Sequence, residues 1–356
     1  MLSSIKWPFL SSSSEEKKPT PRPHIQPHKP IQTKYVSLPV DIPPSFLSLT
    51  PDPALVPDAK PITFHPLDWT STAIPENKGK LAFILENVLS PSECGQLIEY
   101  AEESVPLDSP TAASGANNGP WSPALVNIGP GFEVYEPSYR RSDRIIWDTK
   151  EVADRIWERC LSVEGLRREI EVIQGQERIK KVTGRGEWHG DGGRGRWVMR
   201  RMNERLRFLR YEKGGFFQPH CDSAYYASMD KEQVVKTLLT VHIYLNDCKA
   251  TAEDPDSTEL VGGATTLFSS DEKRRYDVEC KAGRVLVFQH SAVLHSGDEV
   301  KQGVKFSVRS DVLYEQVLAE EEEQEEAEEE AEEEKEEGEG SKYLMGVYNK
   351  HDGVDP

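Results

Sequence analysis

The sequence contains few cysteines and no long apolar run. Its five cysteines are odd in number and widely spaced, and no two of them form a Cys-x-x-Cys motif. This pattern argues against a disulfide framework and a zinc ribbon, and it favours a reducing compartment. No apolar run approaches the roughly 18 residues of a transmembrane helix, and the apolar stretch at the N-terminus is too short for a secretory signal. We therefore expect a cytoplasmic or nuclear protein.

Apolar residues are scarce, and the shortage lies mainly at the two ends of the chain. Hydrophobic residues make up 37% of the 356 positions, and residues 1–60 hold 12 of the 25 prolines. That segment shows neither helical nor strand periodicity, so it buries too little apolar surface to offset its chain entropy. We expect residues 1–79 to form a Pro-rich arm that is largely disordered or wraps the domain in an extended form.

Negative charge is concentrated in one tract near the C-terminus. Residues 320–339 contain fifteen Glu and one Lys, a net charge of -14, whereas the whole chain carries -18. The rest of the chain is therefore close to neutral. Such runs are usually solvated. We expect residues 317–356 to be a Glu-rich tract and tail that can engage a basic partner, and we expect no nucleic-acid or membrane partner.

The part of the chain after the arm predicts a strand and two helices. Residues 81–86 have the texture of a strand, and Ser90 or Ser92 can cap the helix that follows, with Pro91 in its first turn. A second helix is predicted over residues 149–163. The residues expected on the two apolar helix faces are Cys94, Leu97, Ile98 and Ala101 in the first, and Val152, Ile156, Trp157 and Cys160 in the second.

Residues 203–316 consist of short β-like runs separated by Gly, Asp and Ser clusters. No helix-length pattern occurs between Lys236 and Tyr314. This spacing predicts an all-β sandwich or barrel. The chain is therefore expected to be α+β, with one domain over residues 80–316 that has helical support and loops at 80–202 and a β core at 203–316.

The run RFLRYEKGGFFQPHCDSAYY, residues 207–226, ends a predicted strand with two metal-binding side-chain types. His220 and Asp222 are two residues apart, so they share one face of the strand, whereas Cys221 points to the opposite face and is expected to fill the core. An imidazole and a carboxylate on one face are two of the three ligands in the facial triad that binds non-haem Fe(II).

The third ligand has to be an imidazole from a neighbouring strand. His242, His290 and His295 are candidates, and the residues alone leave all three open. A second His-x-Asp pair, His189 and Asp191, lies among glycines. No strand would fix both of its side chains there, so we do not expect it to bind iron.

Residues 80–314 resemble the prolyl 4-hydroxylase (alpha-subunit-like) branch of the Fe(II)/2-oxoglutarate-dependent dioxygenases. The similar motifs are, in order, LRYEKGGFFQPHCD, IYLND, GGATTLF, AGRVLVFQH, AVLHSG and GVKFSVRSDVLY. In that family a basic side chain follows the distal histidine by ten residues. Lys305 stands ten residues after His295, whereas Val300 stands ten after His290. The resemblance implies a double-stranded β-helix, which is a jelly roll preceded by packing helices.

The resemblance also implies an activity, namely hydroxylation coupled to decarboxylation of 2-oxoglutarate to succinate and CO2. The implied cofactors are Fe(II), 2-oxoglutarate, O2 and L-ascorbate, with iron on His220, Asp222 and His295. The implied substrate is a peptidyl proline of a protein or peptide. The alternatives are a hydroxylase of a free amino acid or other small molecule, and a non-catalytic jelly-roll binding or scaffold protein.

A buried cation is needed for the 5-carboxylate of 2-oxoglutarate, because an unpaired anion deep in a barrel is very costly. Lys305 is the expected partner. We expect Gly262 and Gly263 to allow a close backbone approach. The further contacts predicted for the cosubstrate are Tyr211 and Tyr244, which match tyrosines of relatives, Thr240, which shares a strand face with Tyr244, and Ser307 and Arg309, which share a strand face with Lys305.

Overall fold

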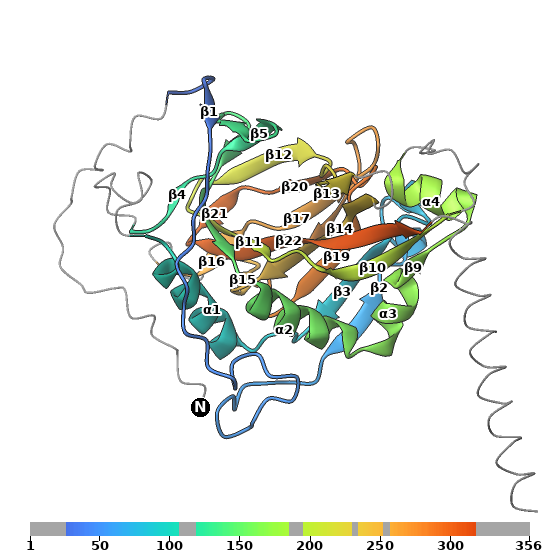
Figure 1. The fold of residues 1–356 in the computed structure, drawn as a ribbon. Coiled ribbons are helices and arrows are strands. Elements are labelled where there is room, and N and C mark those ends of the chain that lie inside the picture. Colours follow the sequence, from blue (N-terminus) through green and yellow to red (C-terminus); the bar gives the residue numbers. More distant parts are fainter. Residues whose placement is uncertain (1–25, 107–118, 185–194, 230–233, 252–256, 318–356) are drawn as a thin grey trace, which may run out of the picture.

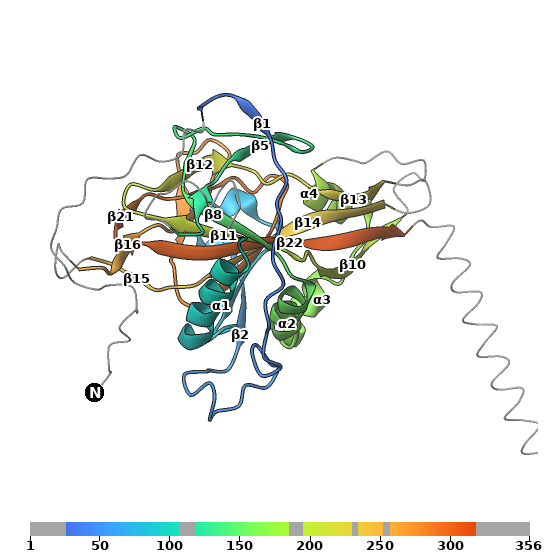
Figure 2. The same cartoon turned by 60° about the vertical axis from the view of Figure 1, so that its left-hand side comes forward.

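Two facing β-sheets and four helices build the protein in this computed structural model (Figure 1), which describes residues 26–106, 119–184, 195–229, 234–251 and 257–317. Figure 2 shows helices α1 and α2 on one side of the large sheet and strand β12 of the small sheet on the other. The helices are α1 (Pro91–Glu103), α2 (Lys150–Leu161), α3 (Glu164–Ile170) and α4 (Gln176–Thr183), with short 3-10 turns η1 (Trp69–Ser71) and η2 (Pro75–Asn77).

The large sheet has a main path of eight strands and three strands that branch from it. The path runs β2 (Thr63–Pro66), β3 (Ala82–Glu86), β19 (Val285–Gln289), β14 (Val234–Tyr244), β22 (Lys305–Val317), β11 (Arg205–Tyr211), β8 (Asp143–Asp148) and β4 (Ser122–Pro123). The branches are β10 (Arg196–Met202) on β22, β9 (Val172–Ile173) on β10, and β13 (Tyr226–Met229) on β14.

The small sheet and two three-stranded sheets complete the β structure. The small sheet runs β18 (Arg275–Val278), β17 (Thr265–Phe268), β20 (His295–Gly297), β12 (Phe216–His220) and β7 (Arg140–Arg141). The other two are β1 (Pro30–Gln32) with β6 (Phe132–Val134) and β5 (Val126–Gly129), and β15 (Cys248–Lys249) with β16 (Leu260–Gly262) and β21 (Val300–Gln302).

The path of the chain between the sheets is jelly-roll-like, as predicted. From β11 onward it passes from the large sheet to β12 in the small sheet, returns to β14, crosses to β17 and β18, returns to β19, crosses to β20 and ends in β22. Each crossing brings residues from distant parts of the sequence into the space between the sheets. The four described helices all precede β10 in the chain, in agreement with the predicted order, but residues 80–202 also contribute strands such as β8 and β10 to the large sheet.

Helix α1 begins as its sequence predicts. The Ser90 hydroxyl accepts a hydrogen bond from the Glu93 backbone N–H at 3.1 Å, and the Glu93 carboxylate accepts one from the Ser90 N–H at 2.8 Å. This is a capping box, and Pro91 occupies the first helical position. The same carboxylate accepts two hydrogen bonds from the buried Arg159 guanidinium of α2, at 2.7 and 2.8 Å. One side chain thus caps α1 and ties it to α2.

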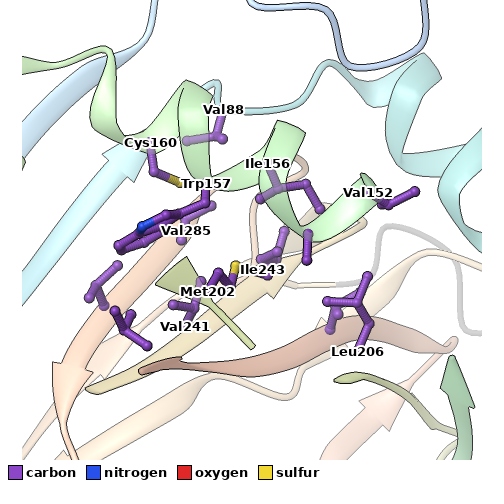
Figure 3. Packing of buried hydrophobic residues seen from close by; sticks show 14 of the residues in the cluster. Val88, Val152, Ile156, Trp157, Cys160, Met202, Leu206, Val241, Ile243 and Val285 are labelled. Atoms are coloured by element: carbon purple, nitrogen blue, oxygen red, sulfur yellow. The ribbon is translucent and has the colours of Figure 1, made fainter. Parts of the chain in front are cut away.

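Helix α2 packs its predicted face on the large sheet. Figure 3 shows Ile156, Trp157 and Cys160 above the sheet residues Val241 and Val285. All five are buried. The pattern was readable because aliphatic residues three and four positions apart lie on one side of a helix. Helices α3 and α4 were not predicted, since seven and eight residues give too few turns for a clear apolar period.

The Pro-rich arm packs on the domain over its described part, residues 26–79. Figure 1 shows it as the blue trace that runs from β1 past the helices. Phe46 is buried, with its ring centroid 5.0 Å from that of Tyr100 in α1. Trp69 is buried as well, and its indole N–H donates to the Lys80 carbonyl at 2.7 Å. The described arm therefore takes the extended, wrapping form, and packing begins before Gly79; the division at residue 80 stays a prediction.

Two further predictions fall outside the described residues. Residues 1–25 of the arm and the Glu-rich tract at 318–356 are not described. The described helices include none that is long and apolar enough to cross a membrane.

Candidate metal centre and cosubstrate pocket

Two neighbouring strands of the small sheet bring the predicted metal ligands together. His220 ends β12 and is the register partner of His295 at the start of β20. Asp222 follows two residues after β12. Its Oδ1 lies 3.9 Å from His220 Nε2, and its Oδ2 lies 3.7 Å from His295 Nε2. One ligand atom from each of the three residues lies within 4.8 Å of the others, which is compatible with a shared ion.

Backbone carbonyls fix the tautomers of both histidines. His220 Nδ1 lies 2.8 Å from the Gln218 carbonyl, and His295 Nδ1 lies 3.0 Å from the Val293 carbonyl. A carbonyl only accepts, so each Nδ1 carries the proton and each Nε2 keeps its lone pair for a metal. Burial lowers the pKa of His220 to about 3, and burial also lowers the pKa of His295 against the opposing effect of Asp222. Both imidazoles are therefore neutral near pH 7, as metal ligands must be.

Asp222 is an ionised carboxylate with a partner at each oxygen. Burial alone would raise its pKa, but the Arg309 guanidinium and the neighbouring histidines hold that pKa well below its usual value. Arg309 Nη2 lies 3.0 Å from Asp222 Oδ1. The Thr240 hydroxyl donates to Asp222 Oδ2 at 2.5 Å. The structure thus places two predicted cosubstrate residues on the acidic ligand.

The alternative histidines do not belong to the centre. His290 is buried, and its Nε2 lies 3.3 Å from Asp311 Oδ1. His242 packs beside Tyr244, with ring centroids 4.9 Å apart. Within the described part of the chain, His220, Asp222 and His295 form the one cluster of three that could hold a metal ion. The other His-x-Asp pair lies in residues 185–194, outside the described ranges.

One expectation for this strand was wrong. Cys221 was expected to fill the core, but it is exposed. The alternation itself is kept, because His220 and Asp222 do face one point. Cys221 follows directly after the last residue of β12, and helices α1 and α2 lie on the far side of the large sheet from this strand (Figure 2).

Lys305 is a buried residue, 2% exposed, at the start of β22, which lies between β11 and β14 in the large sheet. It is the register partner of Tyr211 on β11, while Ser307 two residues later pairs with Tyr244 on β14. The ammonium lies 5.3 Å from the ring centroid of Tyr211 and 5.6 Å from that of Tyr244. The fold therefore brings Lys305, Ser307 and both predicted tyrosines together as neighbours on adjacent strands.

A glycine lets the backbone approach Lys305, as predicted. The ammonium donates to the Gly263 carbonyl at 2.6 Å. Gly263 has a φ of +74°, and a Cβ there would lie 3.2 Å from the Lys305 side chain. At the preceding Gly262, with φ +79°, a Cβ would lie 2.6 Å from the Glu299 carbonyl oxygen. Both positions thus need glycine, since a side chain would clash and strain the backbone.

The domain family follows from the same stretch of sequence. Residues 206–310 match the model of the 2OG-Fe(II) oxygenase superfamily, a span that contains the three predicted metal ligands and Lys305. The match supports a domain of this superfamily over that part of the chain. No curated protein sequence matches the chain.

Solved structures of three prolyl hydroxylases are similar to this chain. A prolyl-4-hydroxylase from Pseudomonas putida shares 16% identity with a TM-score of 0.37, over 69% of this chain and 98% of that one. A viral collagen prolyl hydroxylase from Paramecium Bursaria Chlorella virus-1 shares 16% with a TM-score of 0.35, over 65% and 95%. A prolyl hydroxylase from Trichoplax adhaerens, in complex with a hypoxia inducible factor peptide fragment, shares 14% with a TM-score of 0.37, over 68% and 88%.

The residues present fit the cofactors that the superfamily implies. Two neutral imidazoles and one carboxylate suit Fe(II). Whether the site suits 2-oxoglutarate depends on Lys305, which would have to pair with its 5-carboxylate. No carboxylate in the described residues lies within ion-pair distance of the buried Lys305 ammonium. The buried Ser307 hydroxyl also has no hydrogen-bond partner there. Burial raises the pKa of Tyr244 well above its usual value, so its hydroxyl stays neutral. A buried cation beside uncommitted polar groups suits an anionic ligand.

The sequence reasoning missed residues on both sides of the ligands. Asp311 pairs with Arg309 and His290. Arg309 and Asp311 are charged residues two positions apart in an otherwise largely apolar strand, and this pattern could have indicated a buried ion pair. On the other side the Phe217 ring stacks on His220 at 3.8 Å, with the Arg140 guanidinium 4.5 Å from the Phe217 ring centroid. Nothing in the local sequence of Arg140 marked it, because strand β7 meets β12 only in the folded sheet.

Proposed function

We propose that this oxygenase hydroxylates a prolyl residue of a protein or peptide and decarboxylates 2-oxoglutarate to succinate and CO2. The observation that carries the proposal is a three-ligand centre in the same barrel as a buried ammonium without a carboxylate partner. A triad alone could hold several divalent ions. A buried cation calls in addition for an anionic ligand. 2-Oxoglutarate fits, because it has a carboxylate remote from its metal-chelating oxygens.

The residues of the chain hold and orient the reactants. When bound, Fe(II) supplies the redox chemistry that activates O2 toward an unactivated C–H bond. His220, Asp222 and His295 would hold the iron, and a facial triad of this kind would leave coordination positions for cosubstrate and O2. Lys305 and Ser307 would bind the 5-carboxylate. L-Ascorbate completes the proposed set as the reductant that keeps the iron ferrous.

Aromatic side chains beside the ligands support a peptidyl proline as substrate. The ring centroid of Tyr139 lies 5.4 Å from that of Phe217 and 6.5 Å from that of His220. Tyr225 and Tyr226, just after the acidic ligand, are 54% and 41% exposed. Exposed aromatic faces suit the apolar pyrrolidine ring of proline. The motifs that resemble prolyl 4-hydroxylases give the same substrate class.

The test is turnover of 2-oxoglutarate with Fe(II) and ascorbate across a peptide library. We expect succinate formation that depends on proline-containing peptides, and a gain of one oxygen on proline by mass spectrometry. Protein with His220→Ala is the matched control and should give neither signal. The proposal is overturned if proline peptides stimulate no succinate formation above the peptide-free rate.

Two other outcomes correspond to the alternatives. Stimulation by free amino acids but not by peptides would make the protein a small-molecule hydroxylase. Saturable peptide binding without any 2-oxoglutarate turnover would make it a binding or scaffold protein. The expected basic partner of the Glu-rich tract and the cytoplasmic or nuclear location stay predictions.

A further inference from the structure

Asp222 is held from two directions by residues of the large sheet. Thr240 on β14 donates its hydroxyl to Oδ2 at 2.5 Å, and Arg309 on β22 approaches Oδ1 at 3.0 Å. Asp222 itself lies in the segment that connects β12 of the small sheet to β13 of the large sheet. The acidic ligand is therefore connected across the space between the sheets, whereas the two histidines are fixed by carbonyls two residues before them in the chain.

Arg309 is in turn anchored by a second carboxylate. Its Nη2 lies 3.0 Å from Asp311 Oδ1, two residues further along β22. Arg207 on β11 donates to Asp311 Oδ2 at 3.0 Å, and His290 Nε2 lies 3.3 Å from Asp311 Oδ1. The register of the sheet makes this arrangement, because β22 runs between β11 and β14 and pairs Arg309 with Arg207 and Asp311 with Thr240.

The position of Arg309 argues against a role as the cation for the 5-carboxylate. Arg309 and Lys305 are four residues apart on one strand, which corresponds to about 13 Å between their Cα atoms. Their side chains also have different partners. Lys305 faces the tyrosine rings and the Gly263 carbonyl, whereas Arg309 faces the metal ligand. The two cations therefore serve opposite ends of the site.

A guanidinium suits this position, because the side chain here has to contact two carboxylates at once. Asp222 and Asp311 are both almost fully buried, with side chains 8% and 3% exposed. Two buried anions need a shared cation between them, and a guanidinium presents several donors in a fixed plane. Nη2 of Arg309 lies 3.0 Å from one oxygen of each carboxylate, so this guanidinium bridges Asp222 to Asp311.

We propose that Arg309 is a positioning residue that sets the orientation of the metal-ligating Asp222, with Asp311 as its anchor and Thr240 as the second support. This inference rests on the proposed Fe(II)-dependent function and concerns the same centre. Groups that orient metal ligands typically change metal affinity by about 10- to 100-fold when they are removed.

The test is Arg309→Lys, which keeps the charge but removes the planar fork. We expect the affinity of the cosubstrate-free protein for Co(II) or Mn(II) to fall at least about 10-fold in an equilibrium titration. The visible absorption of the Co(II) form should also change, because a freed carboxylate alters the ligand geometry, and a merely structural role would leave that spectrum unchanged. Thr240→Val should show the same loss in smaller measure, whereas Thr240→Ser keeps the hydroxyl and should match the natural protein.

Lys305→Ala provides the contrast, since we expect it to lose affinity for 2-oxoglutarate while Co(II) affinity stays within about threefold. The inference is overturned if Arg309→Lys binds Co(II) with the natural affinity and spectrum. It is also overturned if its main loss is in 2-oxoglutarate affinity. If Arg309→Lys does not fold, the Thr240 pair decides, and equal metal affinity of the Val and Ser variants overturns the inference.

The two proposals fail in different ways. If His220→Ala binds Co(II) as tightly as the natural protein, the centre itself is wrong and the proposed function fails. If the natural protein binds Co(II) at the triad and turns over 2-oxoglutarate while Arg309→Lys is unaffected, only the role of Arg309 fails.

Discussion

Replacing Lys305 by Ala should weaken binding of 2-oxoglutarate far more than binding of iron. Lys305 is 2% exposed, and its ammonium donates a 2.6 Å hydrogen bond to the Gly263 carbonyl and lies near two tyrosine rings. Removing one partner of a buried charge pair costs about 2–5 kcal/mol, which corresponds to an affinity loss of about 30- to 4,000-fold. Iron affinity should change little, because Lys305 contacts none of the three ligands.

The assay is a 2-oxoglutarate titration of each variant at saturating Fe(II). Lys305→Arg should restore binding only partly, since the guanidinium is larger and the close Gly263 carbonyl leaves it little room. Ser307→Ala should cost about 10- to 100-fold, as expected for one hydrogen bond to a charged group. A cosubstrate analogue without the distal carboxylate, 2-oxobutyrate, gives a second readout. It should bind the natural protein much more weakly than 2-oxoglutarate does, and Lys305→Ala should abolish most of that difference.

One pattern would refute this reasoning. If Arg309→Ala shows the large loss of 2-oxoglutarate affinity and Lys305→Ala does not, the ten-residue spacing from the distal histidine has identified the wrong cation. If Lys305→Ala still discriminates fully between the two oxoacids, the ammonium does not contact the 5-carboxylate.

Three further predictions concern the metal ligands and the packing of the helices. His220→Ala and Asp222→Glu should each abolish turnover, the latter because one methylene displaces the carboxylate by about 1 Å or more. His290→Ala should retain measurable turnover, and equal losses in all three would show that the ligand set is misassigned. Burial lowers the pKa of His220 from 6.5 to about 3, so between these values the unfolded chain binds more protons than the folded one. The free energy of unfolding of the metal-free protein, from urea titrations, should therefore fall as pH falls below about 6.5, by up to about 2 kcal/mol at about pH 5. His220→Asn should flatten this slope, and an unchanged slope would contradict the assignment. Arg159→Ala leaves the buried Glu93 carboxylate without its ion-pair partner, and it should lower the free energy of unfolding by about 3–5 kcal/mol in the same urea titrations. A loss below about 1 kcal/mol would mean that water or another group replaces the guanidinium.

Local patterns in the sequence were enough for parts of the fold and for two of the three predicted metal ligands, whereas His295 was selected by the resemblance. The face of α2 and the cap of α1 depend on residues within four positions of one another, and both are confirmed. The His-x-Asp pair works in the same way, because extended chain turns residues two apart to one side. The roles assigned to Lys305 and the tyrosines rested on resemblance. The structure brings these residues together, while their contact with the cosubstrate stays a prediction.

The sequence by itself determined which residues can carry the chemistry, but the tertiary structure decided which of them meet. His290 and His295 are five residues apart and chemically identical, and only the crossing of β20 to the small sheet puts one beside His220 and leaves the other against Asp311. The sequence placed Arg309 near the cosubstrate, while the register of β22 directs it to Asp222. The physical reason is that strand pairing and sheet-to-sheet contact join residues that are far apart in the chain, and no short-range periodicity records those contacts.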